Sequence, residues 1–212
     1  MELLQYFQAC LEADYIHEAN GASWTVEDRG EEVWILFEKS NGITDWMNNL
    51  QYHAVPYREM NPVWQCHSGF LKVWKSVKPH LEGPVAEAKR RGRRVRVIGY
   101  SHGAAIAVLC HEWIYYRFPA LRQSLCGFGF GCPRVLYGCV SQNLAQRWKK
   151  FYVVRNGEDA VTHLPPRALG YCHVGNLVAI GKDRGYSPID AHRPENYRKE
   201  LQSRQELPPF EG

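Results

Sequence analysis

The feature that most constrains the fold is a Gly-x-Ser-x-Gly pentapeptide at residues 99–103, which reads Gly-Tyr-Ser-His-Gly. A strand-like apolar run at residues 94–100 leads into it, and an alanine-rich, helix-like run at residues 104–118 follows it. A serine on a tight strand-to-helix turn needs glycine on both sides, because a side chain there would collide with neighbouring backbone. The spacing therefore predicts that Ser101 projects above the carboxyl edge of a sheet, beside the N-terminus of a helix.

The pattern along the rest of the chain predicts an α/β fold. The order strand, helix, strand, helix, strand favours a largely parallel sheet covered by helices, with an antiparallel hairpin at one edge that makes the sheet mixed. The expected elements are an amphipathic helix over 2–19 that ends at Asn20-Gly21, a hairpin of 24–26 with 33–37, an irregular region over 41–65, a helix over 69–91 bent or split at Pro79 and Pro84, and strands at 94–100, 128–130 and 151–154.

Length and composition bound the class of protein. The 212 residues predict one domain spanning residues 1–212, and the 45% apolar and 23% charged residues are ordinary for a soluble protein. A formal charge of +4 is too small to indicate nucleic acid as a partner. The seven cysteines lack C-x-x-C spacing and pairing with histidine, so no metal or cofactor is expected.

The same features suggest a compartment. The first residues lack the basic and apolar regions of a secretory signal, and no apolar run is long enough for a transmembrane segment. The cysteine count is odd, so the cysteines cannot all pair within the chain. We therefore expect a cytoplasmic protein with free thiols.

A serine nucleophile needs a base, and the base needs an orienting carboxylate, which in this fold follow in the order Ser, Asp or Glu, His. Glu158 and Asp159 both follow the third predicted strand and compete on spacing alone. Among the downstream histidines, His163 lies too close to Asp159 and in a rigid His-Leu-Pro-Pro stretch. His173 and His192 remain, and the pattern alone does not separate them.

Five sequence blocks around the pentapeptide resemble those of the class 3 lipases, the fungal-type triacylglycerol lipase family of α/β-hydrolases. The resemblance extends from about Val33 to Tyr197 and implies a single α/β-hydrolase domain, with a mostly parallel mixed sheet and helices on both faces. The matching blocks are Ile-Leu-Phe-Glu-Lys-Ser with Ile-Thr-Asp-Trp (35–46), Cys-His-Ser-Gly-Phe-Leu (66–71), Phe-Gly-Cys-Pro-Arg-Val (130–135), the stretch from Asn-Gly-Glu-Asp to Leu-Pro-Pro (156–166), and Tyr-Cys-His-Val-Gly (171–175).

The resemblance also implies roles for individual residues. By motif position Asp159 is the acid of the triad, the histidine at His173 is structural, and the catalytic histidine is His192 in the Asp-His-x-x-Tyr-like tail at residues 190–197. The oxyanion hole is then formed by the backbone N–H of His102 and by Ser40, through its N–H and its hydroxyl.

The chain departs from the family pattern at several positions. The usual motif is Gly-His-Ser-Leu-Gly-Gly, whereas this chain has Tyr100, His102 and Ala104. Lys39 replaces the usual glycine before the oxyanion residue, and the tail is short, because His192 follows His173 by only 19 residues.

The function implied by the resemblance is a serine carboxylic-ester hydrolase that acts on lipid or acylglycerol esters through an acyl-enzyme. Phospholipase, galactolipase and small-ester esterase activities remain open, and the altered pentapeptide motivates an alternative, a catalytically inactive lipase-like module that binds lipid or protein. The expected partners are an ester or lipid substrate and peripheral contact with a lipid surface. Two segments bear on that contact: the basic run 89–96 is either a solvated helix end or a headgroup contact, and the apolar stretch 43–57 is either core packing or a lid or acyl-pocket wall.

Overall fold

A computed structural model describes residues 3–18, 21–38, 52–58, 63–138, 140–181 and 185–203. Within these ranges the main sheet has seven strands in the order β1-β2-β3-β6-β7-β9-β11. Neighbours from β3 to β11 are parallel, and β1, β2 and β3 pair antiparallel, so the predicted mixed sheet is confirmed. The strands are β1 (Ile16–His17), β2 (Ser23–Arg29), β3 (Glu32–Phe37), β6 (Arg94–Tyr100), β7 (Leu125–Phe130), β9 (Phe151–Asn156) and β11 (Asn176–Ile180).

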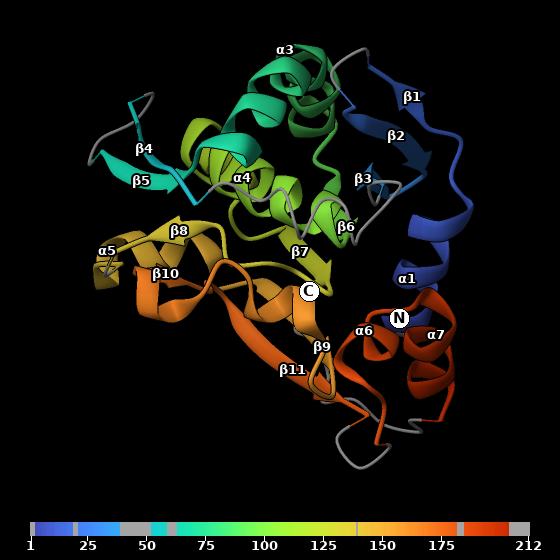
Figure 1. The fold of residues 1–212 in the computed structure, drawn as a ribbon. Helices are drawn as coiled ribbons and strands as arrows, with labels where there is room; N and C mark the ends of the chain where they lie inside the picture. The colour runs from blue at the N-terminus through green and yellow to red at the C-terminus, as the bar shows by residue number, and fades with distance from the viewer. Residues whose placement is uncertain are drawn as a thin grey trace.

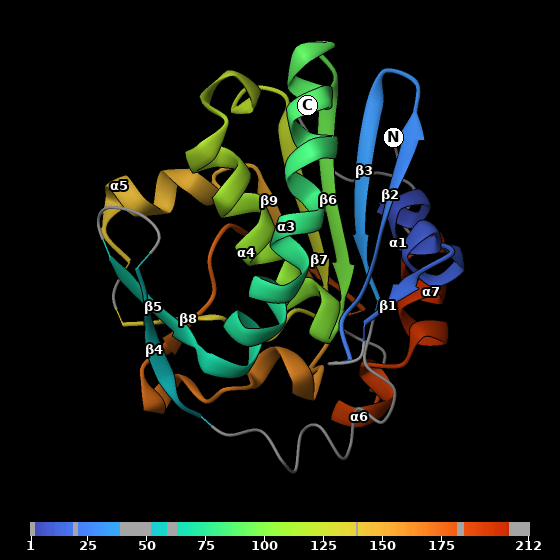
Figure 2. The ribbon, with the colours of Figure 1, turned by 90° about the horizontal axis from the view of Figure 1, so that it is seen from above.

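Helices cover both faces of this sheet, as predicted. The helices α3 (Ser68–Arg90) and α4 (His102–Arg117) lie on one face, and α1 (Leu3–Glu12) and α7 (Pro194–Gln202) lie on the other (Figures 1 and 2). Since successive side chains of a strand point to opposite faces, each central strand contributes to both cores.

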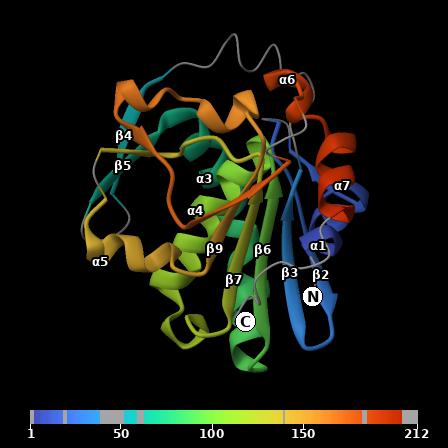
Figure 3. The same ribbon diagram turned by 90° about the horizontal axis from the view of Figure 1, so that it is seen from below.

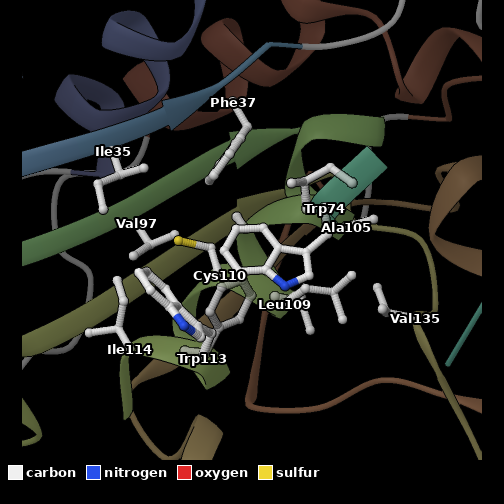
Figure 4. Packing of buried hydrophobic residues seen from close by; sticks show 14 of the residues in the cluster. Ile35, Phe37, Trp74, Val97, Ala105, Leu109, Cys110, Trp113, Ile114 and Val135 are labelled. Carbon is white, nitrogen blue, oxygen red and sulfur yellow. The ribbon is translucent and has the colours of Figure 1, made fainter. Parts of the chain in front are cut away.

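The central strand β6 illustrates this alternation. Val95 and Val97 join the core under α3 and α4, whereas Ile98 and Tyr100 join the core under α1 and α7. Figure 4 shows Val97 in the first of these cores, where the indole rings of Trp74 and Trp113 lie near one another. Both tryptophans are buried, and each large apolar side chain buried in this way contributes about 1.5–3 kcal/mol to folding.

Of the two helices predicted before β6, α3 has nearly the expected extent and α1 is shorter than expected. Pro79 and Pro84 do not split α3, because the helix runs without a break from Ser68 to Arg90. Pro79 is exposed, so water can satisfy the carbonyl that its missing N–H leaves free. The predicted helix over 2–19 ends early, at Glu12, because the hydroxyl of Tyr15 donates to the carbonyl of Cys10 (2.8 Å) and the chain then turns into edge strand β1.

The prediction of irregular structure over 41–65 is wrong for the part that the structure describes. The strands β4 (Ala54–Tyr57), β5 (Trp64–His67), β8 (Leu136–Tyr137) and β10 (Tyr171–Cys172) form a second, antiparallel sheet. Pro56 is tolerated in β4 because this strand lies at the edge, where an N–H is not required for pairing. The buried ring of Tyr57 stacks on Trp64 (centroids 4.6 Å apart) and fixes β4 to β5.

The remaining elements are short, and those after β9 surround the carboxyl ends of the parallel strands. In Figure 3, α6 lies at the same end of the sheet as the tips of β6 and β7. None of the described helices combines the length and the apolar character that a membrane crossing requires. These short elements are η1 (Pro119–Leu121), α5 (Gln142–Ala145), η2 (Gln146–Trp148), η3 (Ala160–His163), η4 (Arg167–Leu169) and α6 (Pro188–Ala191).

Candidate active site

The predicted strand-to-helix turn is present between β6 and α4. Ser101 has φ 58° and ψ −124°, the single positive φ at a non-glycine residue among those described. A Cβ at Gly99 would lie 2.3 Å from the carbonyl oxygen of Gly103, and a Cβ at Gly103 would lie 2.3 Å from that of Phe37. Both glycines are therefore required by close backbone approach, and the backbone N–H of Ser101 donates to Phe130 (2.9 Å) at the end of β7.

The structure brings Ser101, His192 and Asp159 together from three separate parts of the chain. The Ser101 hydroxyl donates to Nε2 of His192 (2.9 Å). On the opposite side of the ring, Nδ1 of His192 donates to Oδ2 (2.8 Å) and Oδ1 (2.9 Å) of Asp159. All three residues are buried, so these hydrogen bonds form where water competes little.

Additional donors hold the Asp159 carboxylate in place. Asp159 caps the 3₁₀ helix η3, where its Oδ1 accepts from the N–H of Val161 (2.9 Å). The hydroxyl of Tyr197, on α7, donates to Oδ2 (2.6 Å) and accepts from the N–H of Asn156 (3.1 Å). The orientation of the carboxylate is thus fixed from β9, η3 and α7 at once.

Gly131 leaves the space that the histidine and the acid occupy. It follows β7 with φ +55°, and a Cβ there would lie 2.7 Å from Cε1 of His192 and 3.0 Å from Oδ2 of Asp159. Gly131 was not predicted as a site residue, although it lies inside the Phe-Gly-Cys-Pro-Arg-Val block. A glycine directly after a strand at the predicted catalytic edge is the signal that identifies it.

Of the two residues expected to bind an oxyanion, the structure describes one. His102 is the first residue of α4, so its backbone N–H lies at the positive end of the helix dipole. Burial, and secondarily the nearby His67, lower the pKa of the His102 side chain to about 4, which leaves it neutral at pH 7. Ser40 lies outside the described residues.

The competing candidates for acid and base lie elsewhere. Glu158 is largely exposed and pairs with His163 (3.4 Å). His173 donates from Nε2 to the carbonyl of Thr162 (2.8 Å), which stabilises η3, the 3₁₀ helix that Asp159 caps. Asp159 and His192 are therefore the pair that meets Ser101.

The basic run 89–96 lies at the opposite end of β6 from Ser101, separated by a strand of roughly 23 Å. Its arginines pair with acids: Arg90 and Arg91 with Glu87, Arg93 with Asp28, and Arg94 and Arg96 with Glu32. This arrangement favours a solvated helix end over a headgroup contact.

The apolar stretch 43–57 is described only from residue 52. Tyr57 is buried and its hydroxyl accepts from the Trp74 indole (3.4 Å), and Val55 packs against the same core, which favours core packing for this end of the stretch. Tyr52 is exposed. Residues 43–51 lie outside the described residues.

The sequence profile of the class 3 lipases matches residues 34–169. The chain belongs to the class 3 lipase family. The chain is 30% identical to the lipase of Rhizomucor miehei over 151 residues, and the match covers 70% of the chain and 41% of that relative. It is 27% identical over 157 residues to secreted mono- and diacylglycerol lipase 1 of Fusarium solani, and the match covers 72% of the chain and 45% of that relative. The chain thus spans less than half the length of these relatives.

Solved structures show the same fold. The Rhizomucor miehei triacylglyceride lipase superposes with a TM-score of 0.74 at 22% identity, over 85% of this chain and 80% of that one. A triacylglycerol lipase whose catalytic centre is described as a serine protease triad superposes with a TM-score of 0.71 at 26% identity, over 79% and 65%. The predicted family and α/β-hydrolase fold are confirmed.

The predicted cytoplasmic location is overturned by the same comparisons. Relatives of this chain from Fusarium solani, Malassezia globosa and Malassezia restricta are named as secreted lipases, which points to an extracellular location. The free thiols that suggested a reducing compartment do not distinguish a cytoplasmic from an extracellular location. Five of the six described cysteines are buried, and burial raises the pKa of Cys126 to about 11 and of Cys66 to about 12, so these two thiols stay protonated near neutral pH.

Proposed function

We propose that this chain hydrolyses carboxylic esters of lipids or acylglycerols, with Ser101 as nucleophile, His192 as general base and Asp159 as the orienting acid. The observation that carries the proposal is the continuous hydrogen-bonded chain from the Ser101 hydroxyl through both ring nitrogens of His192 to Asp159. This chain starts at a serine whose backbone is strained, and strain at a single residue is typical of functional sites.

The reaction proceeds in two steps. Oγ of Ser101 attacks the ester carbonyl while Nε2 of His192 takes the hydroxyl proton, and the resulting imidazolium gives that proton to the leaving alcohol. Water then attacks the acyl-enzyme, with His192 again accepting and returning a proton, which releases the carboxylic acid and restores the serine. Asp159 holds the Nδ1–H tautomer throughout and stabilises the imidazolium.

The oxyanion is proposed to bind at the N-terminus of α4. The N–H of His102 supplies one donor, and Ser40, after β3, supplies the second. Each donor of this kind contributes about 2.7–4 kcal/mol to stabilisation of the transition state. The chemistry proposed here assigns no role to a metal or cofactor.

The substrate class follows from the relatives, which are named for triacylglycerols and for mono- and diacylglycerols. We propose acylglycerols as substrates and peripheral contact with a lipid surface. We also propose a single domain over residues 1–212, because the two hydrophobic cores lie on opposite faces of one sheet. Hydrolysis by the wild type and by Ser101→Ala, across acylglycerol, phospholipid, galactolipid and short soluble esters, tests the proposal. Turnover that the substitution abolishes supports it. A folded wild type inactive on the whole panel would favour the inactive binding module.

The apolar stretch 43–57 bears on how lipid reaches the site. It is short, contains Pro56, and its last residues are fixed in the second sheet, so we expect only a partial cover rather than a long swinging lid. The wild type should therefore hydrolyse a short-chain ester clearly below its solubility limit, with modest activation above it. Rates measured through that limit check this. Negligible monomer turnover followed by a steep rise would contradict it.

A further inference from the structure

Tyr100 directly precedes the proposed nucleophile and contacts the proposed base. Its ring stacks on the imidazole of His192, with centroids 5.2 Å apart and planes inclined by 21°. Its hydroxyl donates a hydrogen bond to the backbone carbonyl of His192. Tyr100 is 1% exposed, so both contacts are shielded from water.

We propose that Tyr100 is a positioning residue that holds the imidazole of His192 for proton transfer and stabilises its cationic form. The inference rests on the proposed function and adds a residue to it. Since Tyr100 and Ser101 are consecutive, the same peptide segment fixes the nucleophile and, through these contacts, the base.

The need for such an anchor follows from the element that carries His192. The histidine caps the C-terminus of α6, a helix of four residues, which is too short to be stable by itself. Two consecutive carbonyls at this point accept side-chain donors from the sheet: Ala191 from Nδ2 of Asn156 (2.9 Å) and His192 from Tyr100. The base is thereby tied to the ends of β9 and β6, the strands that lead to the acid and the nucleophile.

Tyr100 is itself held rigidly. Its ring packs edge-on against Phe7 of α1 (5.3 Å, 85°) and against Tyr197 of α7 (5.7 Å, 64°). Burial, followed by the nearby carboxylates of Asp159 and Glu195, raises the pKa of Tyr100, which keeps the phenol protonated and able to donate.

The stacking also acts on charge. His192 becomes a cation when it accepts the serine proton, and an aromatic face within about 6 Å of a cation stabilises it. The charged and titratable groups around this site are Asp159 before η3, Tyr197 on α7, Glu195 on α7 near Tyr100, and Asp190 on α6, which pairs with Arg193 (2.9 Å).

Two substitutions separate the hydrogen bond from the ring. Tyr100→Phe keeps the ring and should lower kcat about 3–10-fold on a soluble short-chain nitrophenyl ester, the effect of one net hydrogen bond, with KM within about twofold. The acid limb of its pH–rate profile should stay in place. Tyr100→Leu should lower kcat about 10–100-fold and move the acid limb to lower pH by roughly 0.5–1 unit, because the imidazolium loses its aromatic partner.

The matched control is Tyr152→Leu, which removes a similarly stacked ring from the same face of the sheet. Tyr152 stacks on Phe128 (5.6 Å, 19°), away from His192. This variant should lose thermal stability and keep the wild-type position of the acid limb.

A readout without turnover separates this inference from the proposed function. The NMR titration of the His192 imidazole, assigned by its absence in His192→Ala, should shift to lower pH in Tyr100→Leu and stay unshifted in Tyr100→Phe and Tyr152→Leu. A wild type that hydrolyses no ester refutes the proposed function, and the titration still decides the role of Tyr100. An unshifted titration in folded Tyr100→Leu, or a shift of equal size in Tyr152→Leu, would overturn the inference.

Discussion

Ser101 adopts a backbone conformation that costs about 1–3 kcal/mol for a residue with a Cβ. The surrounding structure compensates for this cost, because the Ser101 N–H is paired with Phe130 and its carbonyl accepts from the N–H of Ala104 (3.0 Å). The side chain contributes little packing, so the strain has no role in the core. It serves to direct the hydroxyl at His192.

Replacement of each candidate base by alanine tests the assignment at this scale. His192→Ala should lower kcat at least about 10³-fold, since the members of a triad act as a unit. His173→Ala should retain turnover and lose about 1–2 kcal/mol of stability, because the Thr162 carbonyl loses its donor. Steady-state kinetics with chemical denaturation measures both. Loss of turnover in His173→Ala with retention in His192→Ala would contradict the assignment.

The sequence predicts some site residues and misses others for a physical reason. Ser101 is predictable because its constraint is local and fits within five residues. Asp159 and His192 needed a family pattern, since pairing across 33 residues leaves no local trace. Tyr100 and Gly131 were missed as site residues because their contacts with His192 arise only once β6, β7 and α6 meet.

At the scale of elements, the turn between β6 and α4 tests how tightly the helix must approach the sheet. Gly103→Ala would place a Cβ 2.3 Å from backbone of β3 and should cost on the order of 3 kcal/mol or more, with loss of activity. A Cβ at Gly83 on α3 would meet no atom within 4 Å, so Gly83→Ala should instead raise stability by about 0.5–1 kcal/mol. Thermal unfolding of the two variants checks this. A Gly103→Ala protein with wild-type stability would contradict the packing described here.

Elements with strong patterns were predictable, and those decided by tertiary contacts were not. The strands β6, β7 and β9 and the helix α4 match expectation to within three residues at each end. The helix α1 is shorter than its apolar spacing suggested because Tyr15 terminates it, and β4 escaped prediction because Pro56 argues against a strand unless that strand is known to be at an edge.

At the scale of the whole molecule, one buried histidine, His111, and two half-buried histidines, His102 and His173, make stability depend on pH. Burial lowers the pKa of His111 to about 3 and that of His173 and His102 to about 4, while the unfolded chain binds protons near pH 6.5. Between these values the unfolded state binds more protons than the folded state, so stability falls as pH falls from about 6.5 toward 4. The stability that these neutral histidines contribute is fully present above about pH 6.5.

His111→Leu should flatten this dependence. Removing one buried histidine lowers the slope of unfolding free energy against pH by up to about 1.4 kcal/mol per unit between pH 6 and 4.5. Denaturation curves across that range give the slope, and His53→Ala, which removes an exposed histidine, should keep the wild-type slope. Equal slopes for the wild type and His111→Leu would show that this histidine does not resist protonation.

The central claim is that the folded chain activates Ser101 as a nucleophile, and the site of covalent labelling by a fluorophosphonate probe tests it most directly. Mass spectrometry of the labelled wild type should find a single adduct on Ser101, none in Ser101→Ala, and strongly slowed labelling in His192→Ala, because the hydroxyl then loses its proton acceptor. An adduct on a different serine, or no adduct on wild-type protein whose fold is intact by circular dichroism, would contradict the account.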